Sequence, residues 1–182
     1  MRFTAITAFL LLSSAPAIGE TRTLTFPPEN PQFSVAVGDS WGPEITSAGI
    51  LSAHPTGAAF AVSIFPATAT TAPGAVDEVL TEVQHRFTDV KPGELEHLTG
   101  KKGLKFLERH ATGEDTQATG EDNGARLMLI AAFTIDGKSY FGLFQAGTPQ
   151  ATKRYSADVI AILKSIAPLK SGAGKGQPER GR

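Results

Sequence analysis

Two long apolar segments joined by a turn signal constrain the fold of this chain more than any other feature. They lie within residues 125–147, and Asp136-Gly137 between them is a dipeptide that accepts positive φ at both centres of a type I′ turn. With this dipeptide at the tip, Phe133 is expected opposite Tyr140. Both faces of the resulting hairpin are apolar, so both must be covered. The sequence therefore predicts a hairpin at the centre of a sheet, with a further layer packed on each side.

Two segments with apolar residues at helical spacing supply the expected cover, one before the hairpin and one after it. Residues 74–87 form the first; the second has Thr148 as N-cap and Pro149 at its first helical position, and ends before Pro168. One helix on each face predicts an α+β fold, a three-layer α/β/α sandwich with a mainly antiparallel sheet and two main helices. Two layers, with both helices on one face, are the alternative. The apolar stripes are Val76, Val79, Leu80, Val83 and Phe87, then Tyr155, Val159, Ile162, Leu163 and Ile166.

Short strands are expected on both sides of the first helix. The turns between consecutive strands are short, which favours antiparallel pairing. In the hairpin that follows the first helix, His97 is expected opposite Phe106, with His110 on the same face. The expected strands cover residues 21–26, 33–37, 45–53, 58–65, 95–99 and 104–112.

The first nineteen residues have the pattern of a signal peptide. Arg2 precedes an apolar run over residues 3–12, and Ala17 and Gly19 supply small residues where a signal peptidase reads the chain. Cleavage is expected after Gly19. A run of about ten apolar residues is too short to span roughly 30 Å of hydrocarbon. The sequence thus predicts a periplasmic or secreted protein with no stable membrane anchor after cleavage.

The other end of the chain is also expected to lie outside the folded core. Residues 171–182 contain no large apolar side chain and cannot offset their ordering entropy by burial, so a disordered Gly-rich tail is predicted. Residues 172–176 resemble a phosphate-binding loop, but they lack Ser or Thr after Lys175 and have no helix after them. One domain over residues 20–170 remains.

Charge and cysteine content exclude several classes of function. Loss of Arg2 with the signal peptide takes the 17 Lys and Arg residues to 16, against 18 Asp and Glu, a formal charge of −2. This balance offers no basic excess for a phosphate backbone, so nucleic acid is not expected as a partner. The chain has no cysteine, which excludes disulfides, thiol chemistry and a lipid-modified cysteine.

These elements resemble, in order and spacing, the PsbP/Mog1-like proteins over residues 23–169. The residues that carry the resemblance are residues 33–41, a strand followed by a Gly-x-x-Trp turn, the hairpin over residues 136–140, and the closing helix over residues 155–166. The resemblance implies an antiparallel sheet sandwiched by helices. It also implies non-enzymatic roles, namely accessory subunits, GTPase binding and exported proteins of unknown role. It supplies no catalytic residues to carry over.

One short motif invites a catalytic interpretation. Residues 38–43 read Gly-Asp-Ser-Trp-Gly-Pro, one residue away from the nucleophile motif of chymotrypsin-like proteases, and they contain the Gly-Asp-Ser of SGNH-type esterases. The protease needs a histidine before Ser40, and none precedes it. The esterase needs a later Asp-x-x-His, and the nearest matches are Glu82-x-x-His85 and Glu94-x-x-His97. His85 is expected on the solvent-facing side of the first helix, and Gly42-Pro43 prevents a helix from following Ser40. We therefore expect no enzyme.

No metal or cofactor site is predicted. The four histidines are dispersed, and no local spacing brings the three or four ligands that zinc requires. The polar loop over residues 113–124 repeats Gly-Glu-Asp without the alternating ligands of an EF-hand, so a solvated loop is the first interpretation and a calcium or partner role the alternative. Its candidate ligands are Glu114, Asp115, Glu121, Asp122 and Asn123.

Three functional hypotheses follow. The first is an exported, non-catalytic binding or accessory module that acts through a protein surface, with another protein as its partner. The second is a small-ligand carrier with a pocket between sheet and helix, at a gap left where Ala131 is expected to face Gly142. The third is the Ser40 hydrolase, which the motif supports least.

Overall fold

The computed structural model describes residues 20–100, 103–118 and 124–169. The predicted signal peptide, the whole of the predicted tail and part of the polar loop lie outside these residues, so the predicted domain boundaries stay predictions. The elements in chain order are β1 (Thr21–Phe26), β2 (Phe33–Gly38), the 3₁₀ turn η1 (Asp39–Trp41), β3 (Glu44–Ile45), β4 (Leu51–Ala53), β5 (Phe60–Pro66), α1 (Ala72–Arg86), β6 (Thr88–Pro92), β7 (Glu96–Thr99), β8 (Lys105–Glu114), β9 (Ala125–Thr134), β10 (Tyr140–Gly147), α2 (Pro149–Ser165) and β11 (Ala167–Pro168).

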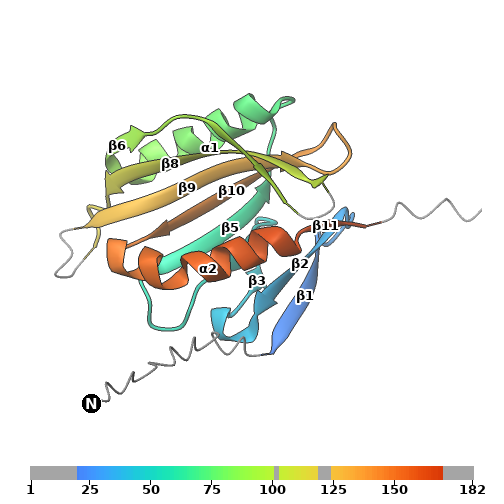
Figure 1. Ribbon diagram of the computed structural model, residues 1–182, viewed down its shortest axis with the longest axis horizontal. Helices are drawn as coiled ribbons and strands as arrows, with labels where there is room; N and C mark the ends of the chain where they lie inside the picture. The colour runs from blue at the N-terminus through green and yellow to red at the C-terminus, as the bar shows by residue number, and fades with distance from the viewer. Residues whose placement is uncertain (1–19, 101–102, 119–123, 170–182) are drawn as a thin grey trace, which may run out of the picture.

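The described strands form two antiparallel sheets (Figure 1). The larger has the order β3-β4-β5-β10-β9-β8-β6, and β7 pairs with the part of β8 that β6 leaves free. The smaller has the order β1-β2-β11. The predicted hairpin, β9 with β10, lies at the centre of the larger sheet, as its two apolar faces require.

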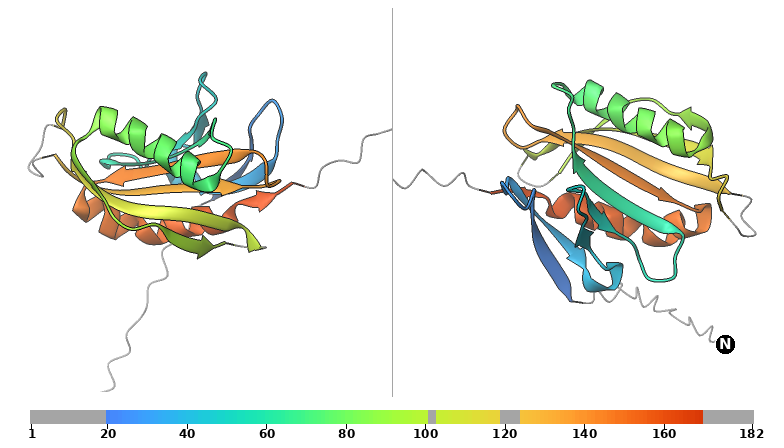
Figure 2. Two further views of the ribbon diagram at one scale, coloured as in Figure 1. Left: turned by 90° about the horizontal axis from the view of Figure 1, so that it is seen from above. Right: turned by 180° about the vertical axis from the view of Figure 1, so that it is seen from behind.

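The two helices lie on opposite faces of the larger sheet, which Figure 2 shows edge-on in its left view. Met128 and Ile130 of β9 are buried with Val79 of α1. Leu129 and Ala131, which alternate with them, are buried in the cluster that contains α2. The predicted three-layer sandwich is therefore confirmed, and the alternative with both helices on one face is wrong.

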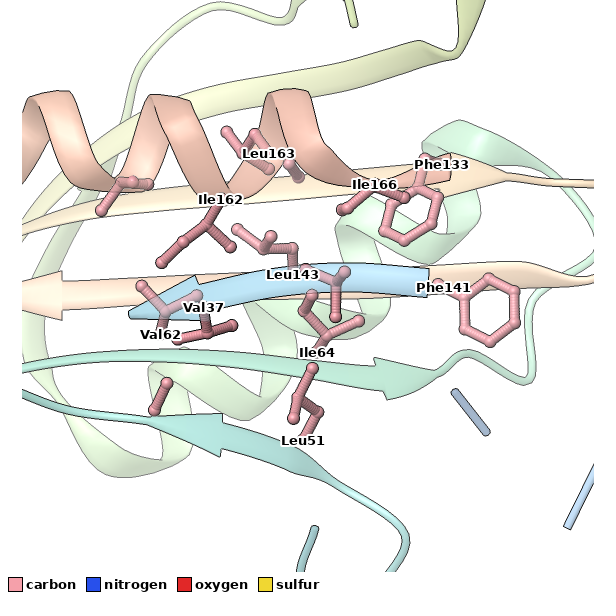
Figure 3. Close-up of a cluster of buried hydrophobic side chains, with 14 of the residues drawn as sticks. Val37, Leu51, Val62, Ile64, Phe133, Phe141, Leu143, Ile162, Leu163 and Ile166 are labelled. Carbon is pink, nitrogen blue, oxygen red and sulfur yellow. The ribbon is translucent and has the colours of Figure 1, made fainter. Parts of the chain in front are cut away.

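The smaller sheet lies beside α2 on the same face of the larger sheet. Val37 of β2 lies beside Val62 of β5, and Ile162 is the nearest labelled side chain of α2 in this view (Figure 3). Ile64, Leu143 and Ile166 belong to the same buried cluster. Together β2 and α2 cover strands β4, β5, β10 and part of β9. Strand β8 extends beyond this cover.

The turn of the central hairpin is longer than the dipeptide predicted. Five residues separate Thr134 from Tyr140, and of Asp136 and Gly137 only Gly137 has a positive φ, at 76°. The Asp136 carboxylate accepts hydrogen bonds from the backbone N–H groups of Ser139 and Lys138, at 2.7 and 2.9 Å, and these bonds lower the pKa of Asp136. The predicted type I′ turn is wrong because this side chain organises a wider loop.

The longer loop shifts the strand pairing by one residue. Phe133 lies opposite Phe141 rather than Tyr140. Since successive side chains of a strand point to opposite faces, the shift turns every residue of β10 over. Leu143 therefore packs toward α2, and Phe144 packs toward α1.

The hairpin of β7 and β8 shows the same kind of difference. Leu98, not His97, lies opposite Phe106, and His97 lies opposite Leu107. His97 and His110 consequently lie on opposite faces of the sheet. The turn that joins the strands includes Gly103 at a φ of 76°, and the N–H of residue 100 donates to the carbonyl of residue 104, so the pairing starts one position away from the expected one.

Several element bounds also differ from prediction. The expected strand over residues 45–53 is two strands, β3 and β4, folded back at Gly49, which has a φ of 70°. Helix α1 begins at Ala72, two residues before the predicted start, because Thr71 is its N-cap and accepts a hydrogen bond from the N–H of Gly74. Strands β6 and β11 were not predicted. Of the described helices, neither is long and apolar enough to cross a membrane.

Candidate functional site

The face of the sheet beside α2 contains a groove where that helix stops covering the strands. We call it the α2 groove, and its volume is about 510 Å³, within the range of small-molecule sites. Helix α2 forms one wall, the β6–β7 segment forms the other, and β8, β9 and β10 form the floor. The apolar side chains that line it are Leu98, Leu127, Leu129, Val159, Ile160 and Leu163.

One wall of this groove carries an exposed apolar side chain. Ile160 is 47% exposed and lies off the buried stripe of α2 that contains Val159 and Leu163. Leu95, in the segment of chain that leads into β7, is 41% exposed but does not line the groove. In the described part of the chain these two are the exposed large hydrophobic residues. The groove therefore offers apolar surface that nothing within the described residues covers.

Two polar side chains lie among these apolar residues. Gln145 of β10 is 5% exposed, and its Nε2 donates a long hydrogen bond of 3.5 Å to the carbonyl of Leu127. The Thr152 hydroxyl of α2 is buried and has no hydrogen-bond partner within the described residues. A buried polar group without a partner costs folding free energy, so a group that enters the groove and bonds the Thr152 hydroxyl would recover this cost.

An acidic residue lies at one end of the groove. Glu108 of β8 lines it, and Glu96 of β7 lies directly opposite Glu108 in the strand pairing. Burial raises the pKa of Glu108, the charge of His110 opposes that shift, and the charge of Glu96 adds to it. Its ionised form is thus less favourable in the folded chain than in the unfolded one.

This shift predicts that Glu108 lowers stability at neutral pH. A raised folded pKa favours the fold below the unfolded pKa, and this contribution disappears as the pH rises through the folded value. We expect Glu108→Gln to raise the urea midpoint slightly at pH 7 and to leave it unchanged near pH 3. The effect is small because solvent screens a partly exposed carboxylate. Glu114→Gln, on the same strand outside the groove, is the control, and an equal gain there would contradict the assignment.

A second cavity, of about 480 Å³, lies on the face that carries α1. Phe65 and Phe144 line it, together with the C-terminal end of α1, including Arg86. The Arg86 guanidinium lies over the Phe87 ring, 5.3 Å from its centroid. We favour the α2 groove as the functional site because it combines buried polar groups with a carboxyl group of raised pKa.

Two solved structures are similar to this chain over most of its length. The solution structure of cyanobacterial PsbP (CyanoP) from Synechocystis matches with a TM-score of 0.57 at 10% identity, and the match covers 87% of this chain and 99% of that one. The chain has the PsbP/Mog1-like fold. The protein of unknown function PA94 from Pseudomonas aeruginosa matches with a TM-score of 0.50 at 10% identity, over 83% of this chain and 99% of that one. No family model matches the sequence, and no curated protein sequence matches it.

The PsbP-like fold places Ser40 in η1, where it is exposed. His54 is the histidine nearest to Ser40 in the sequence, and its backbone N–H donates to the carbonyl of Trp41. Within the described residues no histidine side chain hydrogen-bonds the Ser40 hydroxyl. His85 lines the cavity on the α1 face. The arrangement that a serine hydrolase requires is therefore not assembled around Ser40 in this part of the chain.

The predicted loop over residues 113–124 is only partly described. The Asp115 carboxylate pairs with the Arg126 guanidinium at 3.4 Å and accepts a hydrogen bond from the N–H of Gln117. Glu114 is the last residue of β8, and the remaining predicted calcium ligands, Glu121, Asp122 and Asn123, lie outside the described residues, so this prediction stays a prediction. The described residues include no cluster of three or more metal-ligating side chains.

The gap expected between Ala131 and Gly142 is absent. Because the pairing is shifted, Gly142 lies opposite Ala132 and faces α1. A Cβ on Gly142 would lie 2.7 Å from both the Phe65 ring and a Val79 methyl group. Among the described residues, the cavities between sheet and helix lie elsewhere: the α2 groove on the other face, and the cavity beside the C-terminal end of α1.

Sequence reasoning assigned no role to the residues that form this groove. The sequence pattern did not single out Gln145, which lies on the groove floor. Ile160 carried a usable signal, because it is a large apolar residue outside the predicted stripe of its helix. The position of Glu108 opposite Glu96 depends on the register of β7 with β8, and the predicted register was shifted from the observed one by one residue.

Proposed function

We propose that this chain is an exported, non-catalytic binding module that takes an apolar segment of another protein into the α2 groove. The observation that carries this proposal is the exposure of Ile160 beside an uncovered apolar floor. An exposed apolar surface with a polar rim is typical of a protein-interaction site. Filling the groove would remove this surface from water.

The chemistry of the groove favours binding over catalysis. Its described polar residues include hydroxyl, amide, carboxyl and imidazole groups, but no hydroxyl among them is hydrogen-bonded to a base. The Ser156 hydroxyl donates to the carbonyl of Lys153 in its own helix. An activated nucleophile needs a base within hydrogen-bond reach. Export is supported by the signal-peptide pattern of residues 1–19.

Site-specific photo-crosslinking tests the proposed surface. With p-benzoylphenylalanine at Ile160 in cells of the source organism, we expect one discrete crosslinked protein. The matched control is Ala161, which is exposed one residue further on and about 100° around the helix. Crosslinking at both positions, or at Ala161 alone, would place the partner elsewhere.

Substitution of Ile160 provides the corresponding binding prediction. We expect Ile160→Asp to weaken retention of the crosslinked partner at least tenfold, by about 1.4 kcal/mol or more, because a charge then enters the apolar contact. Stability should change by about 0.5 kcal/mol or less, since Ile160 is exposed. Ala161→Asp is the control. Full retention by the Ile160→Asp chain would contradict the proposal.

The buried Thr152 hydroxyl favours a second candidate, the small-ligand carrier. An apolar ligand with one polar group would satisfy this hydroxyl and fill a cavity of about 510 Å³. Native mass spectrometry of the protein purified from its own source distinguishes the two candidates. A stoichiometric non-protein mass that Ile160→Asp removes would favour the carrier over the protein partner.

A further inference from the structure

We infer that the partner segment carries a lysine or arginine whose charged group pairs with Glu108, while its apolar neighbours occupy the floor of the α2 groove. This inference rests on the proposed function, because it names the chemistry of the partner at the same groove.

The acidic end consists of two carboxylates that form no ion pair among the described residues, although the charge of His110 acts to lower the pKa of Glu108. Glu96 and Glu108 lie directly opposite each other on β7 and β8, an arrangement in which like charges repel. Neither lies within ion-pair distance of a Lys, Arg or His in the described parts of the chain. Desolvation by the groove raises the pKa of Glu108, and the repulsion from Glu96 adds to it. A cation bound here would relieve both effects.

The basic end of the groove is too far away to supply this cation. Lys91 lines the groove, and it lies opposite Thr112 of β8. Thr112 is four residues beyond Glu108, a separation of about 13 Å along an extended strand. The ionisable residues that line the groove are Lys91, Glu108 and His110, and α2 contributes none of them. The groove is therefore negative at one end and positive at the other.

Helix α2, which forms one wall, runs from the Lys91 end of the groove toward the Glu108 end. Gly147 lies opposite Leu127, which in turn lies opposite Thr112, and α2 starts two residues after Gly147. The first turns of α2, with Thr152, are therefore near the Lys91 end, and Leu163 is toward the Glu108 end. A segment in the groove thus has a preferred direction, with its basic side chain near Leu163.

The apolar walls suit the stem of a lysine or arginine. Such side chains lay their methylene groups along apolar surface and keep the charged group at the polar edge. Leu98 and Leu163 line the groove near the acidic end and would contact the stem, with Glu108 beyond them. About four extended residues match a groove length of about 13 Å, so the neighbours of the basic residue would contact Leu127 and Leu129.

The inference is tested with the full mature chain and a panel of fluorescein-labelled, end-blocked nonapeptides. In each peptide Leu, Ile and Val flank one central Lys, Gln or Glu, and affinity is measured by fluorescence anisotropy. We expect the Lys peptide to bind about tenfold more tightly than the Gln peptide, as for a hydrogen bond to a charged group, and the Glu peptide to bind most weakly. Glu108→Gln should remove the preference for Lys, and Glu108→Lys should reverse it in favour of Glu. Glu114→Gln, outside the groove, should keep it.

The outcomes separate this inference from the proposed function. Equal binding of the three peptides would overturn the inference and leave the binding module intact. Absence of binding by all three would overturn both. Saturable binding of n-octylamine with no peptide binding would assign the acidic end to a small amine instead. If the chain dimerises and Ile160→Asp abolishes the dimer, the groove would be assigned to a second copy. Amine binding and dimerisation would each overturn the inference. Melting of the Glu108 variants at a temperature no lower than that of the parent shows that the readout is not loss of folding.

Discussion

Replacement of Phe33 by alanine is expected to lower the free energy of unfolding by about 3–5 kcal/mol. Phe33 is fully buried, and its ring centroid lies 5.5 Å from that of Phe26, 5.4 Å from that of Phe133 and 5.0 Å from that of Phe141. These rings come from both sheets. The cavity left by the truncation cannot collapse without moving one sheet toward the other, so the cost should lie near the upper end of the range.

Urea unfolding followed by the fluorescence of Trp41, the single tryptophan of the chain, measures this loss. Trp41 is buried against the Phe60 and Tyr155 rings, so its emission reports loss of the core. Leu95→Ala is the control, because that side chain is 41% exposed and should cost about 0.5 kcal/mol or less. A loss below about 1.5 kcal/mol for Phe33→Ala would mean that the smaller sheet does not share this core.

The layers of the fold could be predicted because they depend on composition and periodicity. A hairpin that is apolar on both faces needs cover on both sides, and the two amphipathic segments supplied one helix for each. The register could not be predicted in the same way. Asp136-Gly137 suits a two-residue turn equally well, and the wider loop is decided by hydrogen bonds from Asp136 to Lys138 and Ser139.

The candidate site was harder to predict than the fold, because it forms where α2 and β2 no longer cover the larger sheet. Which part of β8 stays uncovered depends on where α2 and β2 lie on the sheet, and both are set by tertiary packing. Single residues carried partial signals. Ile160 lies outside the apolar stripe of its helix, and Gln145 interrupts an apolar strand, but neither pattern says that they line the same groove.

Replacement of Gly142 by valine is expected to lower the free energy of unfolding by about 2–3 kcal/mol, because it overpacks the α1 face of the central strand. A Cβ at this position already lies 2.7 Å from both Phe65 and a Val79 methyl group, and valine adds two further methyl groups. Val79 is buried in the middle of α1, so it can yield only if the helix moves. Urea unfolding measures the loss, and Gly142→Ala should show a smaller loss in the same direction.

The control for this series is Gly38→Ala, since the nearest atom to the added Cβ lies at an ordinary 3.6 Å and the backbone φ of −63° suits alanine. We expect that variant to unfold within about 0.5 kcal/mol of the parent. The comparison decides between two registers of the central hairpin. In the register expected from the sequence, Gly142 faces Ala131 and leaves a gap that valine would fill at little cost. The observed register puts Gly142 against Phe65 and Val79 instead. Parent-like unfolding of Gly142→Val would therefore contradict the observed register and restore the gap, whereas the expected loss supports the packing of Gly142 against α1.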